Sequence, residues 1–331
     1  MLSNKVILIT GGTGSFGHQF VKYILKNYIP KKVIVYSRDE YKQFIMENEY
    51  KGHPQYSKLR FFIGDVRDEA RLRTAMKNVD YVIHAAALKQ VPACEYNPNE
   101  AIKTNIIGAV NVINAALETG VKKVIALSTD KAVNPINLYG GTKLVSDKLF
   151  CASNAYSGTG GTRFAVVRYG NVAGSRGSVI PFFKDIIDRG GTELPITDNR
   201  MTRFWISLED GVKLVIYALE NARGGETFIS KIPSFRITDL AQAMLQGCKM
   251  PEVGIREGEK LHEVMITKED SVHTYEYDRH FIIYPNYNWW GEKELIPGGK
   301  PVKIEFEYSS ESNSEWLTIE KIRELLKNLD I

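Results

Sequence analysis

The sequence lacks the features that define several common classes of protein. Its three cysteines, Cys94, Cys151 and Cys248, are widely separated and odd in number, which argues against a disulfide framework and a cysteine-based metal site. No apolar run approaches the roughly 20 residues of a membrane-spanning helix. The first residues run directly into a strand pattern, without a signal peptide. We therefore expect a cytoplasmic protein that binds neither a metal nor a membrane.

Charge of one sign is also scarce. The formal net charge is only +4 over 331 residues, which argues against a nucleic acid as partner. A slight positive excess still suits a pocket that gathers phosphates. A chain of this length buries a large core, in one large domain or two interleaved ones.

Short β-branched runs are abundant in the first half, and they alternate with helical patterns. The runs lie at 6–9, 33–36, 61–63, 81–83, 124–127 and 164–169, and the clearest helical patterns at 18–26, 101–118 and 139–155. This alternation predicts an α/β protein with a Rossmann-type, doubly wound parallel sheet.

The rhythm breaks after Tyr169. Residues 170–203 are rich in Gly, Pro, Arg and Asn, which predicts an irregular, ligand-facing segment. A helix is expected at 206–221 and a strand at 226–229, followed from about 236 by a mixed region. We assign 1–170 and about 204–235 to a dinucleotide-binding domain. About 171–203 and 236–331 would form a smaller, discontinuous mixed α/β substrate domain.

A glycine-rich loop separates the first predicted strand from the first helix. Glycines allow a tight turn and a close approach of the backbone to a pyrophosphate at the helix N-terminus. Its position between strand and helix predicts a dinucleotide site formed by Gly11, Thr13, Gly14, Ser15, Phe16 and Gly17.

The end of the second strand bears on the choice of cofactor. An NAD site usually places an acid there for the ribose 2′-hydroxyl, but here Ser37 and Arg38 come first, with Lys42 nearby. A guanidinium can hold a 2′-phosphate by paired hydrogen bonds. NADP is therefore favoured, while Asp39, just beyond the strand, keeps NAD open.

Further cofactor contacts are expected where the next strands end. Asp65 and Val66 follow the third strand, and the Asp65 carboxylate would accept a hydrogen bond from the adenine amino group. Ala85 and Ala86 follow the fourth strand, where small side chains let a cofactor lie against the backbone, and Lys89 comes just beyond. Open α/β sheets bind ligands at this carboxyl edge.

Tyr139 and Lys143 are four residues apart, so on a helix both project from one face. A phenol has a pKa near ~10, and a neighbouring ammonium with a nicotinamide cation would favour its phenolate. The spacing alone also fits an ordinary amphipathic helix turn. Ser128, Thr129, Asp130 and Lys131 stand just upstream.

With these motifs in order, the chain resembles the extended short-chain dehydrogenase/reductase superfamily over essentially its whole length. It is most similar to the inverting UDP-N-acetylglucosamine 4,6-dehydratases (5-epimerising) of pseudaminic acid biosynthesis. The segments that carry the closer resemblance are 126–132, 134–140, 167–172, 174–179, 201–205 and 254–263.

The resemblance implies an NADP-dependent hydro-lyase in which NADP stays bound and is recycled. Tyr139, assisted by Lys143 and Thr129, would take the C4 hydroxyl proton as hydride leaves C4. Neutral Lys131 would then remove the C5 proton, and protonated Asp130 would give a proton to the departing C6 oxygen. Burial favours both uncharged forms. If Asp130 and Lys131 paired instead, they would form a salt bridge without an acid–base role.

The implied substrate is UDP-N-acetylglucosamine, and the implied product UDP-2-acetamido-2,6-dideoxy-β-L-arabino-hexos-4-ulose. Substrate contacts are expected from cations and polar groups, since guanidinium groups match phosphate oxygens. The resemblance also implies a homo-oligomer, from a dimer to a hexamer. The expected substrate residues are Lys89, Lys131, Tyr139, Asn171, Arg176, Arg203, Arg256 and Glu259.

Other functions stay open at this point. One alternative is a retaining nucleotide-sugar 4,6-dehydratase or a 4-epimerase that uses the same cofactor. An alternative of another class is a non-catalytic NADP-binding scaffold, since a fold alone does not fix a function.

Overall fold

The computed structural model describes residues 2–158, 160–174, 177–287, 295–327 and 329. Arg176, one of the predicted substrate residues, lies outside these ranges. Within them, no helix has both the length and the apolar character needed to cross a bilayer.

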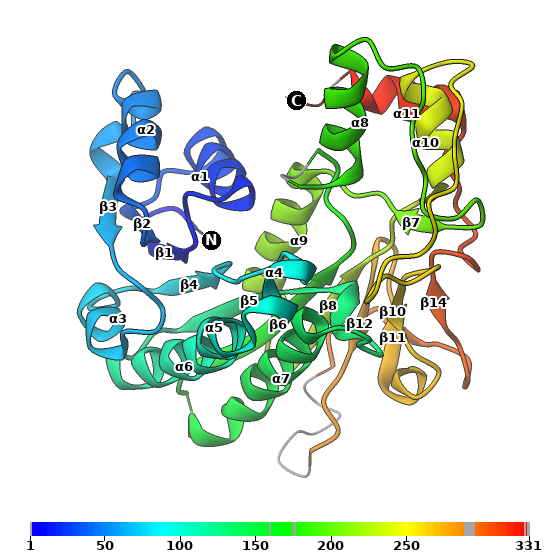
Figure 1. Ribbon diagram of the computed structural model, residues 1–331. Helices are drawn as coiled ribbons and strands as arrows, with labels where there is room; N and C mark the ends of the chain where they lie inside the picture. Colours follow the sequence, from blue (N-terminus) through cyan, green and yellow to red (C-terminus); the bar gives the residue numbers. More distant parts are fainter. Residues whose placement is uncertain (1, 159, 175–176, 288–294, 328, 330–331) are drawn as a thin grey trace.

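The large sheet confirms the predicted fold class. Over the described residues it has ten strands, in the order β13-β11-β12-β8-β6-β5-β4-β1-β2-β3. The predicted runs form its parallel part (Figure 1). Their bounds are β1 Val6–Thr10, β2 Lys32–Ser37, β3 Leu59–Ile63, β4 Tyr81–His84, β5 Lys123–Thr129 and β6 Arg163–Tyr169.

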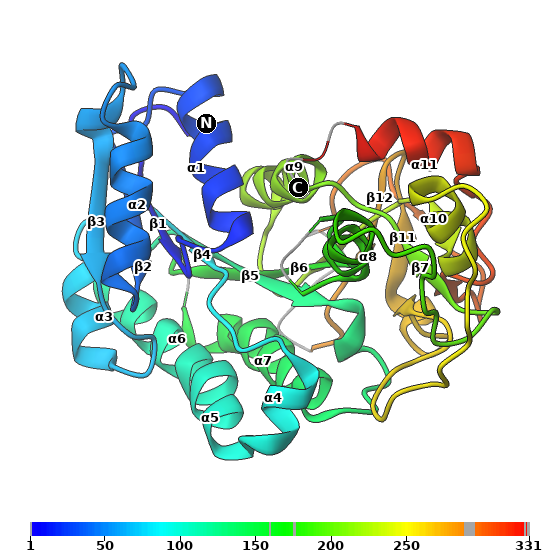
Figure 2. The same cartoon turned by 45° about the horizontal axis from the view of Figure 1, so that its top comes forward.

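Helices cover both faces of this sheet (Figure 2). Helix α1 (Ser15–Asn27) packs beside α9 (Leu208–Asn221) on one face. On the other face, α3 (Glu69–Ala75) packs against α6 (Gly108–Thr119), which contacts α7 (Leu138–Ala152). The remaining helices of this half are α2 Glu40–Tyr50, α4 Val91–Tyr96 and α5 Pro98–Ile102, which a π turn at Lys103–Ile107 joins to α6.

Segments from the second half extend the sheet past β6. Strand β8 (Thr227–Ser230) pairs parallel to β6, and β12 (His280–Ile283), β11 (Thr274–Glu276) and β13 (Lys300–Pro301) then add antiparallel strands. These last three strands come from the segment that we assigned to the substrate domain. The proposed domain division therefore stays a prediction, with the sheet itself running across it.

A second hydrophobic cluster lies beyond the sheet, around the helices at the upper right of Figure 1. The segment 170–203, predicted to be irregular, contains α8 (Val179–Asp188), so that part of the prediction was wrong. Ile180 and Phe183 point into this cluster and stabilise the helix by burial. The other elements are β7 Thr202–Phe204, β9 Ser234–Arg236, β10 Val264–Ile266, β14 Tyr308–Ser309, α10 Ile237–Met244 and α11 Ile319–Leu326.

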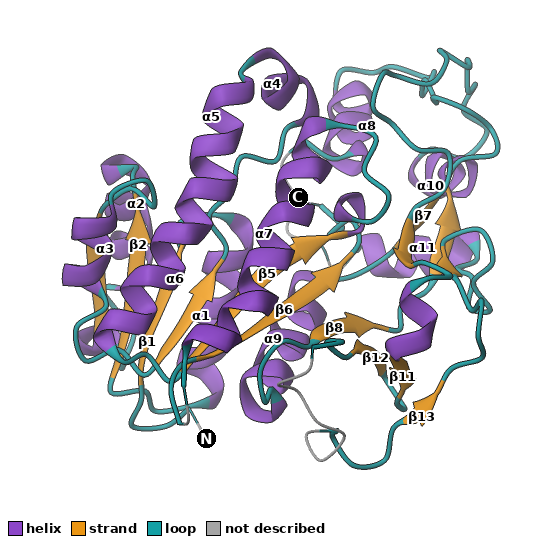
Figure 3. Cartoon of the chain, turned by 90° about the horizontal axis from the view of Figure 1, so that it is seen from below, coloured by secondary structure: helices purple, strands orange, loops and turns teal. Residues whose placement is uncertain are grey.

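The topology fixes where a ligand can bind. Strand β1 lies between β4 and β2, so the strand order reverses there, and a crevice forms at the carboxyl edge of such a sheet. Strands β5 and β6 run toward the side where α8 and β7 lie (Figure 3). The second half of the chain thus faces the end of the parallel sheet.

Candidate active site

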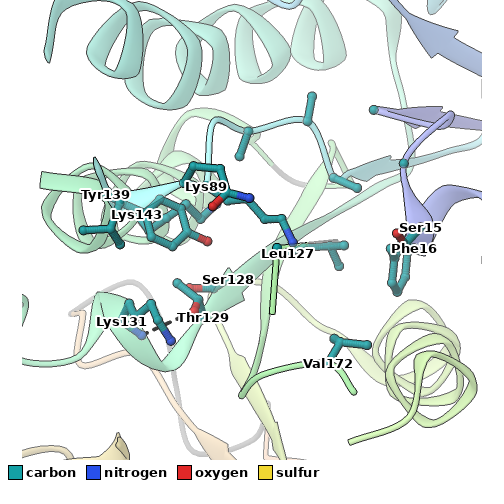
Figure 4. A pocket seen from close by; sticks show the side chains of 18 of the residues that line it. Ser15, Phe16, Lys89, Leu127, Ser128, Thr129, Lys131, Tyr139, Lys143 and Val172 are labelled. Atoms are coloured by element: carbon teal, nitrogen blue, oxygen red, sulfur yellow. Dashed lines mark hydrogen bonds between the residues drawn. The ribbon is translucent and has the colours of Figure 1, made fainter. Parts of the chain in front are cut away.

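A cavity of about 680 Å³ opens at the carboxyl edge of the parallel strands. One part is lined by residues 11–17 and 37–42, which we call the dinucleotide end. The opposite part, the acid–base end, is formed around Asp130, Lys131, Arg203 and Glu263. In Figure 4, Lys131, Thr129, Tyr139 and Lys143 face a common space, with Ser15 and Phe16 across from them.

The glycine-rich loop is shaped as the sequence predicts. Gly11 has a φ of +65°, and an added Cβ would come within 2.9 Å of the Ala86 backbone. At Gly17, in the first turn of α1, an added Cβ would lie 2.1 Å from the Gly12 carbonyl oxygen. Only glycine fits at these contacts. All six predicted loop residues line the cavity: Gly11, Thr13, Gly14, Ser15, Phe16 and Gly17.

The end of β2 presents hydroxyl and guanidinium groups. Ser37 Oγ lies 2.8 Å from Thr13 Oγ1, and the Arg38 side chain is half-exposed on the cavity wall. The Asp39 carboxylate caps α2 by accepting from the Lys42 backbone N–H at 3.0 Å, and it pairs with Lys42 Nζ at 3.0 Å. Asp39, the residue that left NAD possible as the cofactor, is thus already bound to Lys42.

The predicted contacts after β3 and β4 are brought together only in part. Val66, Ala85, Ala86 and Lys89 line the cavity. Asp65 does not, because its carboxylate accepts a hydrogen bond from Arg67 Nη2 at 2.7 Å. Its role toward adenine stays a prediction that this conformation does not favour.

Helix α7 carries both Tyr139 and Lys143 into the cavity wall. Asn137 caps the helix, its Oδ1 accepting from the Gly140 N–H at 2.8 Å. Gly140 packs under the loop, since an added Cβ would lie 2.1 Å from the Lys131 carbonyl oxygen. The helix start is therefore locked beside Lys131.

The surroundings of Tyr139 differ from our expectation. Burial raises the pKa of Tyr139 to about 12, although the Lys131 charge and a hydrogen bond with Thr129 lower it. Burial also lowers the pKa of Lys143. The chain's own cations therefore do not produce a phenolate, because desolvation outweighs them. A further positive charge beside the ring is required.

Two hydroxyls upstream of Tyr139 have separate roles. Thr129 Oγ1 donates to Asp130 Oδ1 at 2.8 Å, and the same hydroxyl is hydrogen-bonded to Tyr139. Ser128 Oγ instead donates to Asp147 Oδ2 at 2.5 Å, away from the tyrosine. Thr129, as predicted, is thus the hydroxyl next to the phenol.

Lys131 is held by three acceptors from distant parts of the chain. Its Nζ lies 3.1 Å from Asp130 Oδ1, 2.9 Å from Asn171 Oδ1 and 3.2 Å from Glu263 Oε1. These contacts use the three N–H donors of an ammonium group. The Asp130 carboxylate is fully buried beneath Lys131 and does not line the cavity.

This network corrects one of the two protonation states that we expected. Burial disfavours the Lys131 ammonium, but the carboxylates of Asp130 and Glu263 outweigh it and raise the pKa of Lys131. For Asp130, burial and the nearby Glu263 charge raise the pKa despite Lys131. The pKa of Asp130 is thus shifted toward the protonated form that we expected, whereas that of Lys131 is shifted away from the neutral form. The expectation of a neutral Lys131 rested on burial and did not include the negative charge of Glu263.

The predicted substrate residues are distributed unevenly. Arg256 is exposed at the cavity mouth, whereas Arg203 is buried and donates to the carbonyl oxygens of Thr202 and Leu261 at 2.7 and 3.1 Å. Glu259 Oε1 lies 3.5 Å from Arg203 Nη2. All five residues Lys89, Asn171, Arg203, Arg256 and Glu259 line the cavity.

Sequence reasoning missed Glu263 and Lys260 as parts of the site. Both belong to the segment 254–263, which lines the cavity along much of its length and which we call the strap. Lys260 Nζ donates to the Val133 carbonyl at 2.5 Å, and Asn137 Nδ2 donates to the Gly258 carbonyl at 2.7 Å. The strap was noticed only for its resemblance, and no local pattern in it revealed which carboxylate turns inward.

A family model described as "Polysaccharide biosynthesis protein" matches residues 7–285. The chain belongs to this family. One relative, "UDP-N-acetylglucosamine 4,6-dehydratase (inverting)" of Campylobacter jejuni subsp. jejuni, is 55% identical over 100% of this chain and 99% of its own length. Another family relative, "UDP-glucose 4-epimerase" of Rickettsia typhi, is 44% identical over 100% of this chain and 97% of its own.

Solved structures place the family in the extended short-chain dehydrogenase/reductase fold. Pen from Bacillus thuringiensis superposes with a TM-score of 0.88 at 38% identity, covering 99% of both chains. DesIV, the dTDP-glucose 4,6-dehydratase of Streptomyces venezuelae, solved with NAD and TYD, gives a TM-score of 0.67 at 24% identity over 77% of this chain and 86% of its own. At that identity, DesIV supports the fold alone.

Proposed function

We propose that this chain is a UDP-N-acetylglucosamine 4,6-dehydratase that inverts C5, a hydro-lyase acting in the cytoplasm. Its product would be UDP-2-acetamido-2,6-dideoxy-β-L-arabino-hexos-4-ulose, the first intermediate of pseudaminic acid biosynthesis. The enzyme would work as a homo-oligomer, from a dimer to a hexamer. The 55% identity to an inverting dehydratase over the whole chain supports this choice of reaction.

One observation carries the proposal. Beside Tyr139, the site holds a second acid–base unit, in which the Lys131 Nζ contacts the Asp130 and Glu263 carboxylates at 3.1 and 3.2 Å. Oxidation at C4 alone requires only the tyrosine, its lysine and a hydroxyl. Elimination of the C6 hydroxyl also requires a base for C5 and an acid for the leaving oxygen, and this unit supplies both.

The dinucleotide end fits NADP. The tight approach at Gly11 and Gly17 leaves backbone amides open toward a pyrophosphate at the start of α1. Ser37, Arg38 and Lys42 would hold the 2′-phosphate, since Asp39 is occupied as a helix cap. When bound, NADP would accept hydride from C4 and return it to C6, and its positive ring would supply the charge that Tyr139 lacks.

The residues of the chain then divide the proton transfers. Tyr139, assisted by Thr129 and Lys143, takes the proton of the C4 hydroxyl. Lys131 removes the C5 proton, which the C4 ketone has made acidic. Asp130 supplies the proton for the departing C6 oxygen. In this conformation the Thr129 hydroxyl, 2.8 Å from Asp130, and the Lys131 ammonium connect Asp130 with the cavity.

Substrate binding would use the cations around the strap. Arg256 and Lys89 are exposed and would bind the diphosphate. Arg203 is buried and would hold Glu259 and Glu263 in position through its contacts with their carboxylates. Arg176 is proposed from the sequence alone. Asn171 orients Lys131 through its 2.9 Å contact and completes the sugar side of the cavity.

The test is an NMR assay of the purified protein with UDP-N-acetylglucosamine in deuterated water. We expect a 6-deoxy-4-keto product with inverted C5 and deuterium at that carbon. A product that keeps the original C5 configuration would show a retaining dehydratase, and a mere C4 epimer would refute dehydration. Recovery of unchanged substrate with bound NADP would favour the scaffold.

A 4-epimerase is the second candidate function. The 44% identity to proteins named UDP-glucose 4-epimerase favours it. The same NMR assay with UDP-glucose separates the two, because an epimerase yields UDP-galactose without incorporating deuterium at C5.

A further inference from the structure

Glu263 comes from a part of the chain remote from Asp130 and Lys131, at the junction of the strap and β10. It is 2% exposed and its loop is fixed, because its backbone N–H donates to Ser310 Oγ at 2.9 Å and its carbonyl accepts from the Ser310 N–H at 2.8 Å. Its side chain nevertheless lines the cavity. The fold thus carries a buried carboxylate to the acid–base end.

The carboxylates beside Lys131 have different surroundings. Glu263 Oε1 lies 3.2 Å from Lys131 Nζ and 3.6 Å from Arg203 Nε, so it has two cations nearby. Asp130 is fully buried and has, besides Lys131, a neutral hydroxyl from Thr129. Both carboxylates are buried, so negative charge is more stable on Glu263, which has two cations, and a proton is more stable on Asp130, which has one.

Unsatisfied atoms indicate that the network is incomplete without a ligand or a proton. Asp130 Oδ2 and Glu263 Oε2 are both buried, and neither has a hydrogen-bond partner among the described residues. A buried acceptor without a partner is costly. A proton on Asp130 would remove most of this cost at that residue, because a neutral acid is far less costly to bury than an anion.

We propose that Glu263 is the counter-ion of Lys131 and that it thereby leaves Asp130 uncharged as the proton donor of the site. This assignment rests on the proposed dehydratase function and deepens it. Glu263 acts through Lys131 and Asp130, so it is a positioning residue. The burial of Asp130 and the Glu263 charge raise the pKa of Asp130, in agreement with the geometry.

The same contact explains how a charged lysine becomes a base. A proton moves from the Lys131 ammonium to the Glu263 carboxylate, leaving a neutral amine and a neutral acid. The amine then takes the C5 proton, while Asp130 protonates the C6 oxygen that leaves as water. The proton on Lys131 next passes to the Asp130 carboxylate across their 3.1 Å contact, and Glu263 returns its own proton to Lys131. All three residues end as they began. A proton from solvent added to the opposite face of C5 completes the inversion, while Tyr139 releases to solvent the proton that it took from the C4 hydroxyl.

Other ionisable groups lie around Asp130, Lys131 and Glu263, and the proposal gives them no new role. They are Tyr139 from α7, Arg203 from β7, Lys260 from the strap and Lys89 from the loop after β4. Glu263→Gln keeps the size of the side chain beside Arg203 and removes only its charge, so a difference between the two proteins reports the Glu263 charge.

The test titrates Asp130 directly. Protein labelled with ¹³C at the aspartate carboxyl groups is followed by NMR over pH, and an Asp130→Asn variant identifies the Asp130 signal. We expect that signal to titrate above the ordinary range of aspartates and to move to lower pH in Glu263→Gln, where Asp130 must neutralise Lys131. Glu263→Asp should restore the high value. An Asp130 titration that is unchanged in Glu263→Gln would overturn the assignment.

Activity gives a second readout. Glu263→Gln should lower kcat for dehydration by about 10²-fold and change its pH profile, with little change in KM. Glu311→Gln, an exposed carboxylate two residues from β14, is the matched control and should leave both unchanged. A parent enzyme that forms no dehydrated product would refute the proposed function, whereas the titration judges the counter-ion assignment independently.

Discussion

The two ends of the cavity are formed by different kinds of chain segment. The dinucleotide end uses two short stretches, 11–17 and 37–42, and offers backbone amides and exposed side chains such as Arg38. The acid–base end joins segments up to 132 residues apart, and Asp130, Arg203 and Glu263 are almost wholly buried. The dinucleotide end is formed by the backbone geometry of local segments, and the acid–base end by contacts between segments that are distant in the sequence. We therefore expect the dinucleotide end to be more sensitive to changes of shape, and the acid–base end to changes of charge.

Removing the central cation should have the largest effect. Lys131→Met keeps the length of the side chain but removes the base, so kcat for dehydration should fall by about 10³-fold, which corresponds to about 4 kcal/mol. Affinity for NADP, measured by calorimetric titration, should stay within about twofold if the two ends are independent.

The matched control is Lys213→Met, an exposed lysine on α9, which should keep full activity. Lost NADP affinity in Lys131→Met would break the comparison, because it would show that the acid–base end helps to hold the cofactor.

The second prediction concerns shape at the dinucleotide end. In Gly17→Ala the new Cβ would meet the Gly12 carbonyl oxygen at 2.1 Å, so the loop or α1 must shift. We expect a loss of about 3 kcal/mol in the free energy of unfolding, measured in urea, together with weak NADP binding. In Gly52→Ala, where nothing lies within 4 Å of the new Cβ, stability should be unchanged. Equal effects of the two substitutions would contradict a rigid loop.

These contrasts explain what the sequence could predict. The parallel strands and the glycine loop follow from local patterns, because β-branched runs and strand–glycine–helix order act over a few residues. The spacing of Tyr139 and Lys143 is also local, but their role and that of Thr129 came from the family resemblance. Helix α8 was missed because the glycines and prolines around it hid its apolar face, which only the second cluster explains.

The protonation of Lys131 was beyond local reasoning. Adjacency to Asp130 suggested a pair, and burial suggested that both lose their charge. The sequence did not show the second carboxylate, Glu263, which lies 132 residues away and adds to Asp130 in raising the pKa of Lys131. Hydrogen bonds between the strap's end and Ser310 hold it there. A single sequence contains no local signal for such a contact.

The third prediction tests charge at the dinucleotide end. Arg38→Ala should weaken NADP binding by about 30-fold, or about 2 kcal/mol, because a charge-assisted contact to the 2′-phosphate is lost. Binding of NAD, which lacks that phosphate, should hardly change, and both are measured by the same titration. If Arg38→Ala weakened the two cofactors equally, Arg38 would be holding something other than the 2′-phosphate. Asp39 would then have to be reconsidered as a ribose ligand.

The smallest effect should come from His84, a buried residue of the cavity wall. Burial, with the Lys143 charge, lowers the pKa of His84 to about 3, and its Nδ1 lies 2.9 Å from Thr10 Oγ1. The folded protein keeps His84 neutral, whereas the unfolded chain takes up a proton below about pH 6.5. Stability is therefore lost as pH falls from about 6.5, by about 1 kcal/mol between pH 7 and pH 5.5. Urea unfolding of the parent and of His84→Asn at both pH values isolates the contribution of His84 to this loss, because His84→Asn should lose less stability over the same interval. An equal loss in the two proteins would mean that His84 is not desolvated, and that water reaches it in the cavity wall.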